Sequence, residues 1–136
     1  MSKKILFICK HNRFRSKVAE MFFKKYNTNK NYVGMGAGLL PGSYPLDKIQ
    51  VKVAKEFGIE LSGKPKPITM ELLSKIDILV IVADNVPSEI FNSKKYGLDE
   101  RRWEIHDTIN CDEEEVRKIM LKIENKVIDF VRELNE

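Results

Sequence analysis

A cysteine and an arginine near the start of the chain have the spacing of a nucleophile that works on a bound oxyanion. Cys9 is followed by five residues and then by Arg15 and Ser16. A loop that enters a helix directs successive backbone N–H groups at one point, and the helix dipole adds positive potential there. A thiol in such a field ionises more easily, and the thiolate is its reactive form. Arg15 has a planar fork that matches two oxygens of a tetrahedral anion, and the Ser16 hydroxyl can donate to the Cys9 sulfur.

These residues are expected where a buried strand meets a helix. The run Lys4–Ile8 is short and apolar, as buried strands are, and Ser16–Tyr26 has apolar residues at helical spacing. Ligands of open parallel sheets bind beyond the carboxyl ends of the strands. The predicted segment that binds the oxyanion, such as a phosphate, therefore consists of the residues that follow Cys9: Lys10, His11, Asn12, Arg13, Phe14, Arg15 and Ser16.

Strand and helix patterns alternate along the rest of the chain. Asp77–Ala83 is continuously apolar after its first residue, which is typical of a parallel strand buried on both faces. Asp112 and Glu115 have the spacing of a capping box at the start of a long amphipathic helix. The order predicts one α/β domain over residues 1–136, with a parallel sheet and helices on both faces. The other predicted strands are Tyr32–Gly38 and Arg102–Ile105, and the helical segments are Leu46–Phe57, Met70–Lys75, Ser88–Asn92 and Asp112–Leu134.

Composition excludes several classes of protein. A chain of 136 residues with 43% apolar and 32% charged residues can bury one core, and its apolar runs are too short for a membrane span. The apolar stretch near the N-terminus is also too short for a secretory signal, so a cytoplasmic protein is expected. Two cysteines do not make a disulfide framework, and no His, Asp or Glu cluster has metal-ligand spacing. The net charge of +4 is spread along the chain, which argues against a nucleic-acid partner.

The candidate nucleophile and arginine belong to a longer motif, Ile5-Leu6-Phe7-Ile8-Cys9-x5-Arg15-Ser16-x2-Ala19-Glu20-x-Phe22. Further along the chain come Gly36-Ala37-Gly38, Asp77–Asn85 and, ahead of the last helix, Trp103–Asp107. In these segments the chain resembles the low-molecular-weight protein tyrosine phosphatases and the related thioredoxin-coupled arsenate reductases. The resemblance implies the fold of that family, a three-layer structure in which a four-stranded parallel sheet has helices on both faces.

The resemblance also implies a mechanism. Cys9 matches the family's nucleophile, Arg15 its phosphate-binding arginine, Ser16 the hydroxyl that stabilises the thiolate, and Asn12 the loop asparagine. Asp107 matches the acid that protonates the leaving oxygen and then activates water. The implied reaction is hydrolysis of a phosphorylated protein or a small phosphomonoester, as in a protein tyrosine or aryl phosphatase. It proceeds through a phosphocysteine and needs neither metal nor cofactor.

The aromatic residues of the family's phosphotyrosine site are replaced in this chain. Asp107 is followed by Thr108 instead of proline, and the aromatic residues that usually come next are missing. Phe14, Tyr44 and Trp103 are the candidates for an aromatic wall, although we interpret Trp103 as a core residue. A module that binds phosphate or phosphopeptides without effective turnover is therefore one alternative.

Arsenate reductase is the second alternative. His11 and the Asp84-Asn85 pair resemble that branch of the family. A reductase needs further cysteines that relay electrons, but Ala83 occupies the first relay position and Phe14 replaces the second loop cysteine. Cys111 is the one remaining thiol besides Cys9, and we interpret it as an inert residue.

Overall fold

The computed structural model describes residues 2–136 and consists of four strands and six helical segments. The strands are Lys3–Cys9 (β1), Tyr32–Gly38 (β2), Ile78–Val82 (β3) and Asp99–Trp103 (β4). The helices are Arg15–Tyr26 (α1), Lys48–Glu56 (α2), Met70–Lys75 (α3), Ser93–Tyr96 (α4) and Glu113–Leu134 (α5), with a 3-10 turn at Ser88–Phe91 (η1).

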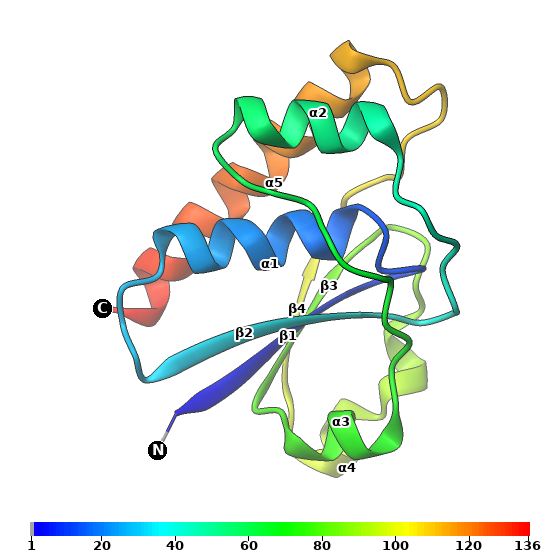
Figure 1. Cartoon of the computed structure of the whole chain (residues 1–136). Helices are drawn as coiled ribbons and strands as arrows, with labels where there is room; N and C mark the ends of the chain where they lie inside the picture. Colours follow the sequence, from blue (N-terminus) through cyan, green and yellow to red (C-terminus); the bar gives the residue numbers. More distant parts are fainter. Residues whose placement is uncertain (1) are drawn as a thin grey trace.

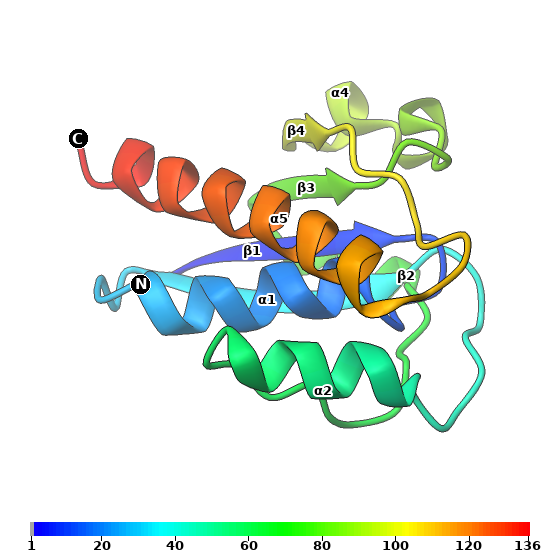
Figure 2. The same ribbon diagram turned by 90° about the horizontal axis from the view of Figure 1, so that it is seen from above.

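The strands form one parallel sheet in the order β2-β1-β3-β4. Helices α1, α2 and α5 cover one face, while α3 and α4 lie on the other, which gives three layers (Figures 1 and 2). The predicted fold class is thus confirmed. Since all strands run in the same direction, their carboxyl ends meet at one edge, and the loops that follow β1, β3 and β4 gather there.

The alternation of side chains along β1 explains how the sheet supports a core on each face. Ile5 and Phe7 pack among residues of α1 and α5, whereas Leu6 and Ile8 pack with residues of α3 and η1 on the other face. Phe7 also lies 5.9 Å from the Trp103 ring, centroid to centroid. Trp103 is 8% exposed and is therefore a core residue, so it does not form a wall of the site.

One predicted strand differs from the structure, and one short helix has no counterpart in the prediction. The last strand is β4, Asp99–Trp103, not Arg102–Ile105. It is an edge strand with several charged side chains, so it lacks the apolar run that marks β1 and β3. Helix α4 was not predicted because it has four residues between two left-handed positions, Asn92 and Gly97.

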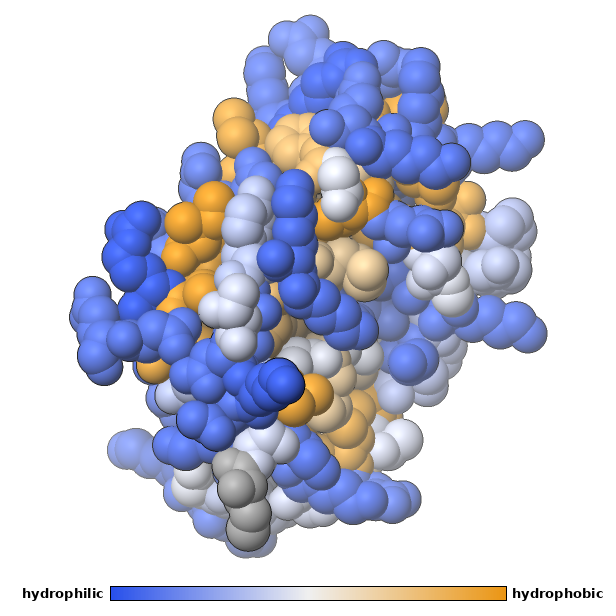
Figure 3. Space-filling model, turned by 60° about the vertical axis from the view of Figure 1, so that its left-hand side comes forward, coloured by the Kyte–Doolittle hydropathy of each residue, from blue (hydrophilic) through white to orange (hydrophobic). Residues whose placement is uncertain are grey.

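Exposed hydrophobic side chains are scattered over different parts of the fold. Among residues 2–136, no helix combines the length and the apolar character that crossing a bilayer requires. Charged and polar side chains cover most of the face in Figure 3, and hydrophobic ones appear in separate areas between them. The most exposed large hydrophobic residues, Ile109 and Met70, belong to different parts of the fold.

Candidate active site

The predicted phosphate-binding loop connects the carboxyl end of β1 to the first residue of α1. Asn12, in the middle of this loop, has a left-handed backbone with φ of 55°, a conformation that asparagine tolerates better than most residues. Cys9, Asn12, Arg15 and Ser16 are each at most 2% exposed. The loop therefore brings four of the predicted site residues together at the sheet edge and shields them from water.

Hydrogen-bond donors converge on the sulfur of Cys9. The backbone N–H of Asn12 donates to Sγ at 3.3 Å, and the Ser16 hydroxyl lies 3.1 Å from Sγ. The Asn12 side-chain amide donates to Ser16 Oγ at 2.6 Å, while its carbonyl oxygen accepts the Lys66 N–H at 3.0 Å. Because Ser16 Oγ already accepts one bond, its own hydrogen is free to point at the sulfur. Both donors stabilise a thiolate.

The end of β2 packs directly against this loop at Gly38. A Cβ at that position would lie 2.5 Å from the carbonyl carbon of His11 and 2.7 Å from the backbone nitrogen of Asn12. Both neighbours are backbone atoms and cannot rotate away. The close approach therefore requires glycine.

We expect Gly38→Ala to displace the loop. The free energy of unfolding should fall by about 1–3 kcal/mol through overpacking, and hydrolysis of phosphate esters, the reaction that the sequence resemblance implies, should slow by at least about tenfold through misplacement of the donors. Urea unfolding and steady-state kinetics measure the two effects. The matched control is Gly97→Ala, which strains a residue with φ of 67° but meets nothing within 4 Å. It should lose stability and keep its activity, and equal activity in both variants would contradict the prediction.

Arg15 is held by residues that follow two other strands. Its Nη1 donates to the carbonyl oxygen of Ile105 at 2.9 Å, and its Nη2 donates to Oδ1 of Asn85 at 3.0 Å. The carboxylates of Asp84 and Asp107 lie 3.6 and 3.8 Å from the guanidinium. These contacts fix the orientation of a side chain that is 1% exposed, and they compensate its buried charge.

Asp107 lies on the loop between β4 and α5 and faces the same cavity as Cys9. The cavity has a volume of about 190 Å³. The Asp107 side chain is 46% exposed, and its Oδ1 accepts the N–H of Thr108 at 2.8 Å. The cavity is lined by Cys9, His11, Arg13, Phe14, Arg15, Gln50, Asp107 and Thr108.

The remaining predicted loop residues have different positions. Ser16 and Asn12 lie behind the cavity wall, where they contact the sulfur and each other. Arg13 donates to the carbonyl oxygens of Ser43 and Pro45 and so holds the neighbouring loop. Lys10 is not among the lining residues, and its carbonyl oxygen accepts the Leu40 N–H at 2.8 Å.

One of the three candidates for an aromatic wall lines the cavity. Phe14 does so although it is 3% exposed. Tyr44 is 57% exposed and is not a lining residue, and Trp103 lies in the core. Phe14 is therefore the aromatic contact that the cavity offers to a substrate.

Three residues that contact the site were not assigned a role from the sequence. Asp84 and Asn85 hold Arg15, and they follow β3 at its carboxyl end, so the rule that located Cys9 could have found them. Gln50 lies on α2, is 5% exposed, and donates from Nε2 to Oγ1 of Thr108 at 3.3 Å. A glutamine in an amphipathic helix carries no sequence signal for a site.

Cys111 lies beyond the Asp107 loop and has φ of 54°. Burial, together with a hydrogen bond to Asp47, raises the pKa of its thiol to about 11. A thiol with such a pKa is mostly protonated at neutral pH and is a poor nucleophile. Within residues 2–136, no group of three or more His, Cys, Asp or Glu side chains is arranged to hold a metal ion.

Comparisons with known proteins identify the family of the chain. The sequence profile of the family described as low molecular weight phosphotyrosine protein phosphatase matches residues 4–136. The chain is 32% identical over 122 residues to an arsenate reductase of Halalkalibacterium halodurans, covering 77% of this chain and 86% of that protein.

Solved structures share the fold. A protein tyrosine phosphatase from Entamoeba histolytica superposes with a TM-score of 0.85 at 21% identity, covering 98% of this chain and 97% of the other. The YwlE arginine phosphatase from Geobacillus stearothermophilus superposes with a TM-score of 0.84 at 17% identity, covering 98% and 93%. The match of the profile across nearly the whole chain shows that the protein belongs to the low molecular weight phosphotyrosine protein phosphatase family.

Proposed function

We propose that the protein hydrolyses phosphomonoesters through a phosphocysteine at Cys9, and that its substrates are tyrosine-phosphorylated protein or small aryl phosphates. The observation that carries the proposal is the convergence of two donors on the Cys9 sulfur, inside a cavity that Arg15 and Asp107 also line. A thiolate, an anion-binding guanidinium and a carboxyl group at one cavity are the parts that this reaction needs.

The reaction has two steps. The Cys9 thiolate attacks phosphorus, and the bond from phosphorus to the leaving oxygen breaks while Asp107 gives that oxygen a proton. Water then attacks the phosphocysteine, Asp107 takes the proton of the water, and the thiolate leaves with the Ser16 hydroxyl donating to it. Arg15 and the loop amides stabilise the phosphoryl oxygens in both steps.

The size and lining of the cavity support a compact substrate group. About 190 Å³ is enough for a phosphate and part of an attached ring. Phe14 provides one apolar contact, while Gln50 and Thr108 provide polar ones on the side of Asp107. The chain's net charge of +4 attracts a phosphate dianion.

Asp107→Asn tests this proposal. With phenyl phosphate, a poor leaving group, kcat/KM should fall by about 10²–10⁴-fold, because that oxygen needs a proton in the transition state. With 4-nitrophenyl phosphate the loss should be much smaller. The variant should show a burst of nitrophenol, since formation of the phosphocysteine outruns its hydrolysis when no base activates water, and mass spectrometry of the quenched protein should find the adduct on Cys9.

The matched control is Asp129→Asn, on the exposed surface of α5, which should behave as wild type. Equal losses with both substrates and no adduct would refute the role of Asp107. A wild-type protein that binds phosphate but hydrolyses neither ester would refute the hydrolase and support the alternative of a binding module.

Arsenate reduction is the second candidate, favoured by the similarity to the Halalkalibacterium reductase. Reduction of arsenate oxidises Cys9, and a second cysteine must then attack the Cys9 sulfur to form a disulfide that thioredoxin can reduce. Cys111 is the only other cysteine in the chain. The raised pKa of Cys111 and its hydrogen bond to Asp47 argue against that role. Assays with arsenate, thioredoxin and its reductase are therefore expected to consume no NADPH, and steady consumption would favour the reductase.

A further inference from the structure

The carboxylate of Glu115 binds a run of backbone amides in the loop that carries Asp107. It accepts the N–H of Ile109 on both oxygens, at 2.9 and 3.1 Å, that of Asn110 at 3.1 Å and that of Cys111 at 2.8 Å. Successive N–H groups that point at one spot form an anion-binding concavity. In this protein the anion is a side chain of the same molecule.

This contact differs from the capping box that the sequence predicted. Asp112 does cap α5, since its Oδ1 accepts the Glu115 N–H at 2.8 Å. In a capping box, the Glu115 side chain would reach back to the N–H of Asp112 itself. The carboxylate instead reaches past Asp112 to the three preceding residues, and so ties the loop, as well as the helix end, to α5.

Helix α5 provides a rigid base for this contact. Val116, next to Glu115, is fully buried, and Ile119, one turn further on, is 3% exposed. Arg117 donates to Glu56 at the end of α2 and to Glu113. The start of α5 is therefore fixed both to the core and to a neighbouring helix.

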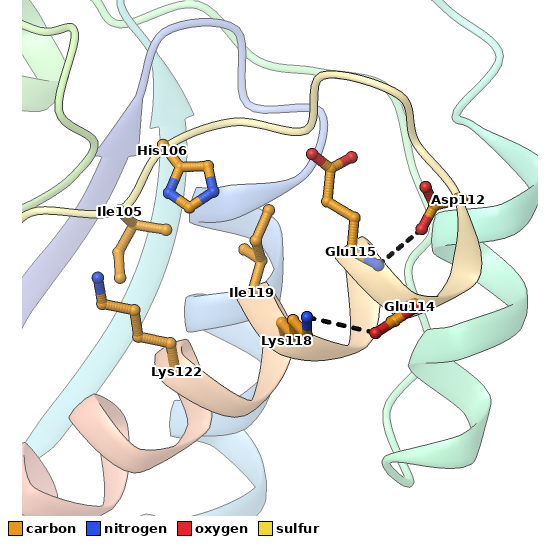
Figure 4. A pocket seen from close by; sticks show the side chains of 8 residues that line it. All are labelled: Ile105, His106, Asp112, Glu114, Glu115, Lys118, Ile119 and Lys122. Carbon is orange, nitrogen blue, oxygen red and sulfur yellow. Dashed lines mark hydrogen bonds and ion pairs between the residues drawn. The ribbon is translucent and has the colours of Figure 1, made fainter.

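Besides Glu115, the loop is anchored by the Cys111 side chain, which packs against the core and contacts Asp47, and by Asp107, which lies 3.8 Å from the Arg15 guanidinium. Ile109 is 83% exposed, so its side chain contributes no packing. Asp107 and Thr108 are linked by one local hydrogen bond, and Thr108 receives one from Gln50. In the close-up of Figure 4 the Glu115 carboxylate points up to the loop, whereas Glu114 pairs with Lys118 on the side of the helix away from it. Glu115 thus makes most of the contacts that fix residues 109–111.

We propose that Glu115 is a positioning residue for the general acid: its carboxylate fixes the loop after Asp107 so that the Asp107 carboxyl group reaches the leaving oxygen. The inference rests on the proposed function, because it concerns the step in which Asp107 donates a proton. It also explains how the loop can keep its conformation with Thr108 instead of a proline after Asp107. The three backbone amides that bind Glu115 restrict the loop, as the ring of a proline would.

The protonation of Glu115 is consistent with this role. The hydrogen bond from Ile109, with those from Cys111 and Asn110, holds the pKa of the Glu115 carboxyl group below its usual range. Because this pKa is lowered in the folded protein, the contact stabilises the fold at pH values above the ordinary pKa of a glutamate. The stabilisation is lost as the pH falls through the pKa that Glu115 has in the folded protein. At neutral pH the Glu115 carboxylate is therefore charged and can bind all three amides.

The test compares Glu115→Gln with Glu114→Gln. The neutral amide that Glu115→Gln introduces would accept through one oxygen and would lack the charge. Hydrogen exchange of the amides of residues 109–111, followed by NMR, should accelerate by about tenfold or more in Glu115→Gln. It should stay unchanged in Glu114→Gln, which removes an exposed charge on the same turn.

Kinetics distinguish positioning from mere stability. In Glu115→Gln, kcat/KM for phenyl phosphate should fall by about tenfold relative to kcat/KM for 4-nitrophenyl phosphate, because this parameter reports formation of the phosphocysteine and only the poor leaving group depends there on a well-placed acid. An unchanged kcat/KM with both esters, or equal losses of kcat/KM in both, would overturn the proposal even if the thermal stability drops. If the wild type hydrolyses neither ester, the proposed function fails. Unchanged hydrogen exchange of the amides of residues 109–111 in Glu115→Gln would separately refute the role of Glu115 in fixing the loop.

Discussion

Cys9→Ser is expected to lose turnover by about 10⁴-fold or more while the protein still binds inorganic phosphate. A serine hydroxyl is not ionised at neutral pH, so the attacking group disappears, whereas Arg15 and the amides of the loop keep their positions. Steady-state hydrolysis of 4-nitrophenyl phosphate measures the first effect, and calorimetric titration with phosphate measures the second.

The control for this variant is Cys111→Ser. Cys111 does not line the cavity, and its thiol contacts Asp47 at the start of α2. The variant should keep wild-type rates. Turnover near the wild-type rate in Cys9→Ser would show that the covalent mechanism is wrong.

Arg15→Lys should lower kcat/KM by about 10²–10³-fold, the size of effect that follows loss of one transition-state donor. The guanidinium of Arg15 uses separate nitrogens to hold Ile105 and Asn85, and its planar fork still has N–H groups for a phosphate. A lysine has one nitrogen and cannot make these contacts together. Steady-state kinetics and phosphate titration both measure the loss, and weaker phosphate binding should accompany it.

Arg132→Lys, near the exposed end of α5, is the matched control and should change neither quantity. A fall in stability alone, with unchanged kinetics, would mean that Arg15 only bridges the loops. Circular dichroism at the assay temperature separates that case from a site that has lost its anion contact.

The parts of the fold that bury continuous apolar runs could be predicted from the sequence. β1 and β3 are buried along most of their length, so most of their residues are apolar and their pattern is unambiguous. β4 is different, because Arg101 pairs with Asp99 beside it and with Glu133 on α5. An edge strand stabilised by ion pairs that form only after folding resembles a polar loop in sequence.

The candidate site divides in a similar way. The contacts among Cys9, Asn12 and Ser16 join residues at most seven positions apart, and such local geometry can be inferred from spacing. Gln50 contacts Thr108, 58 positions further along the chain, so this contact depends on how α2 packs over the loop and no local pattern specifies it. The Glu115 contacts are close in sequence, but the capping-box pattern points to the N–H of Asp112 instead of those of residues 109–111.

The anchoring of Arg15 has a consequence for the order in which the protein becomes active during synthesis. Its partners Asn85 and Ile105 lie 70 and 90 positions further along the chain. The contacts of the nucleophile loop among Cys9, Asn12 and Ser16, and that of Asn12 with Lys66, can form once the chain up to Lys66 has emerged from the ribosome. The guanidinium of Arg15 has no fixed orientation until the residues after β4 have been synthesised. A nascent chain that ends before them holds a reactive cysteine without an oriented anion-binding partner, and only a chain that extends past Asp107 acquires a complete site.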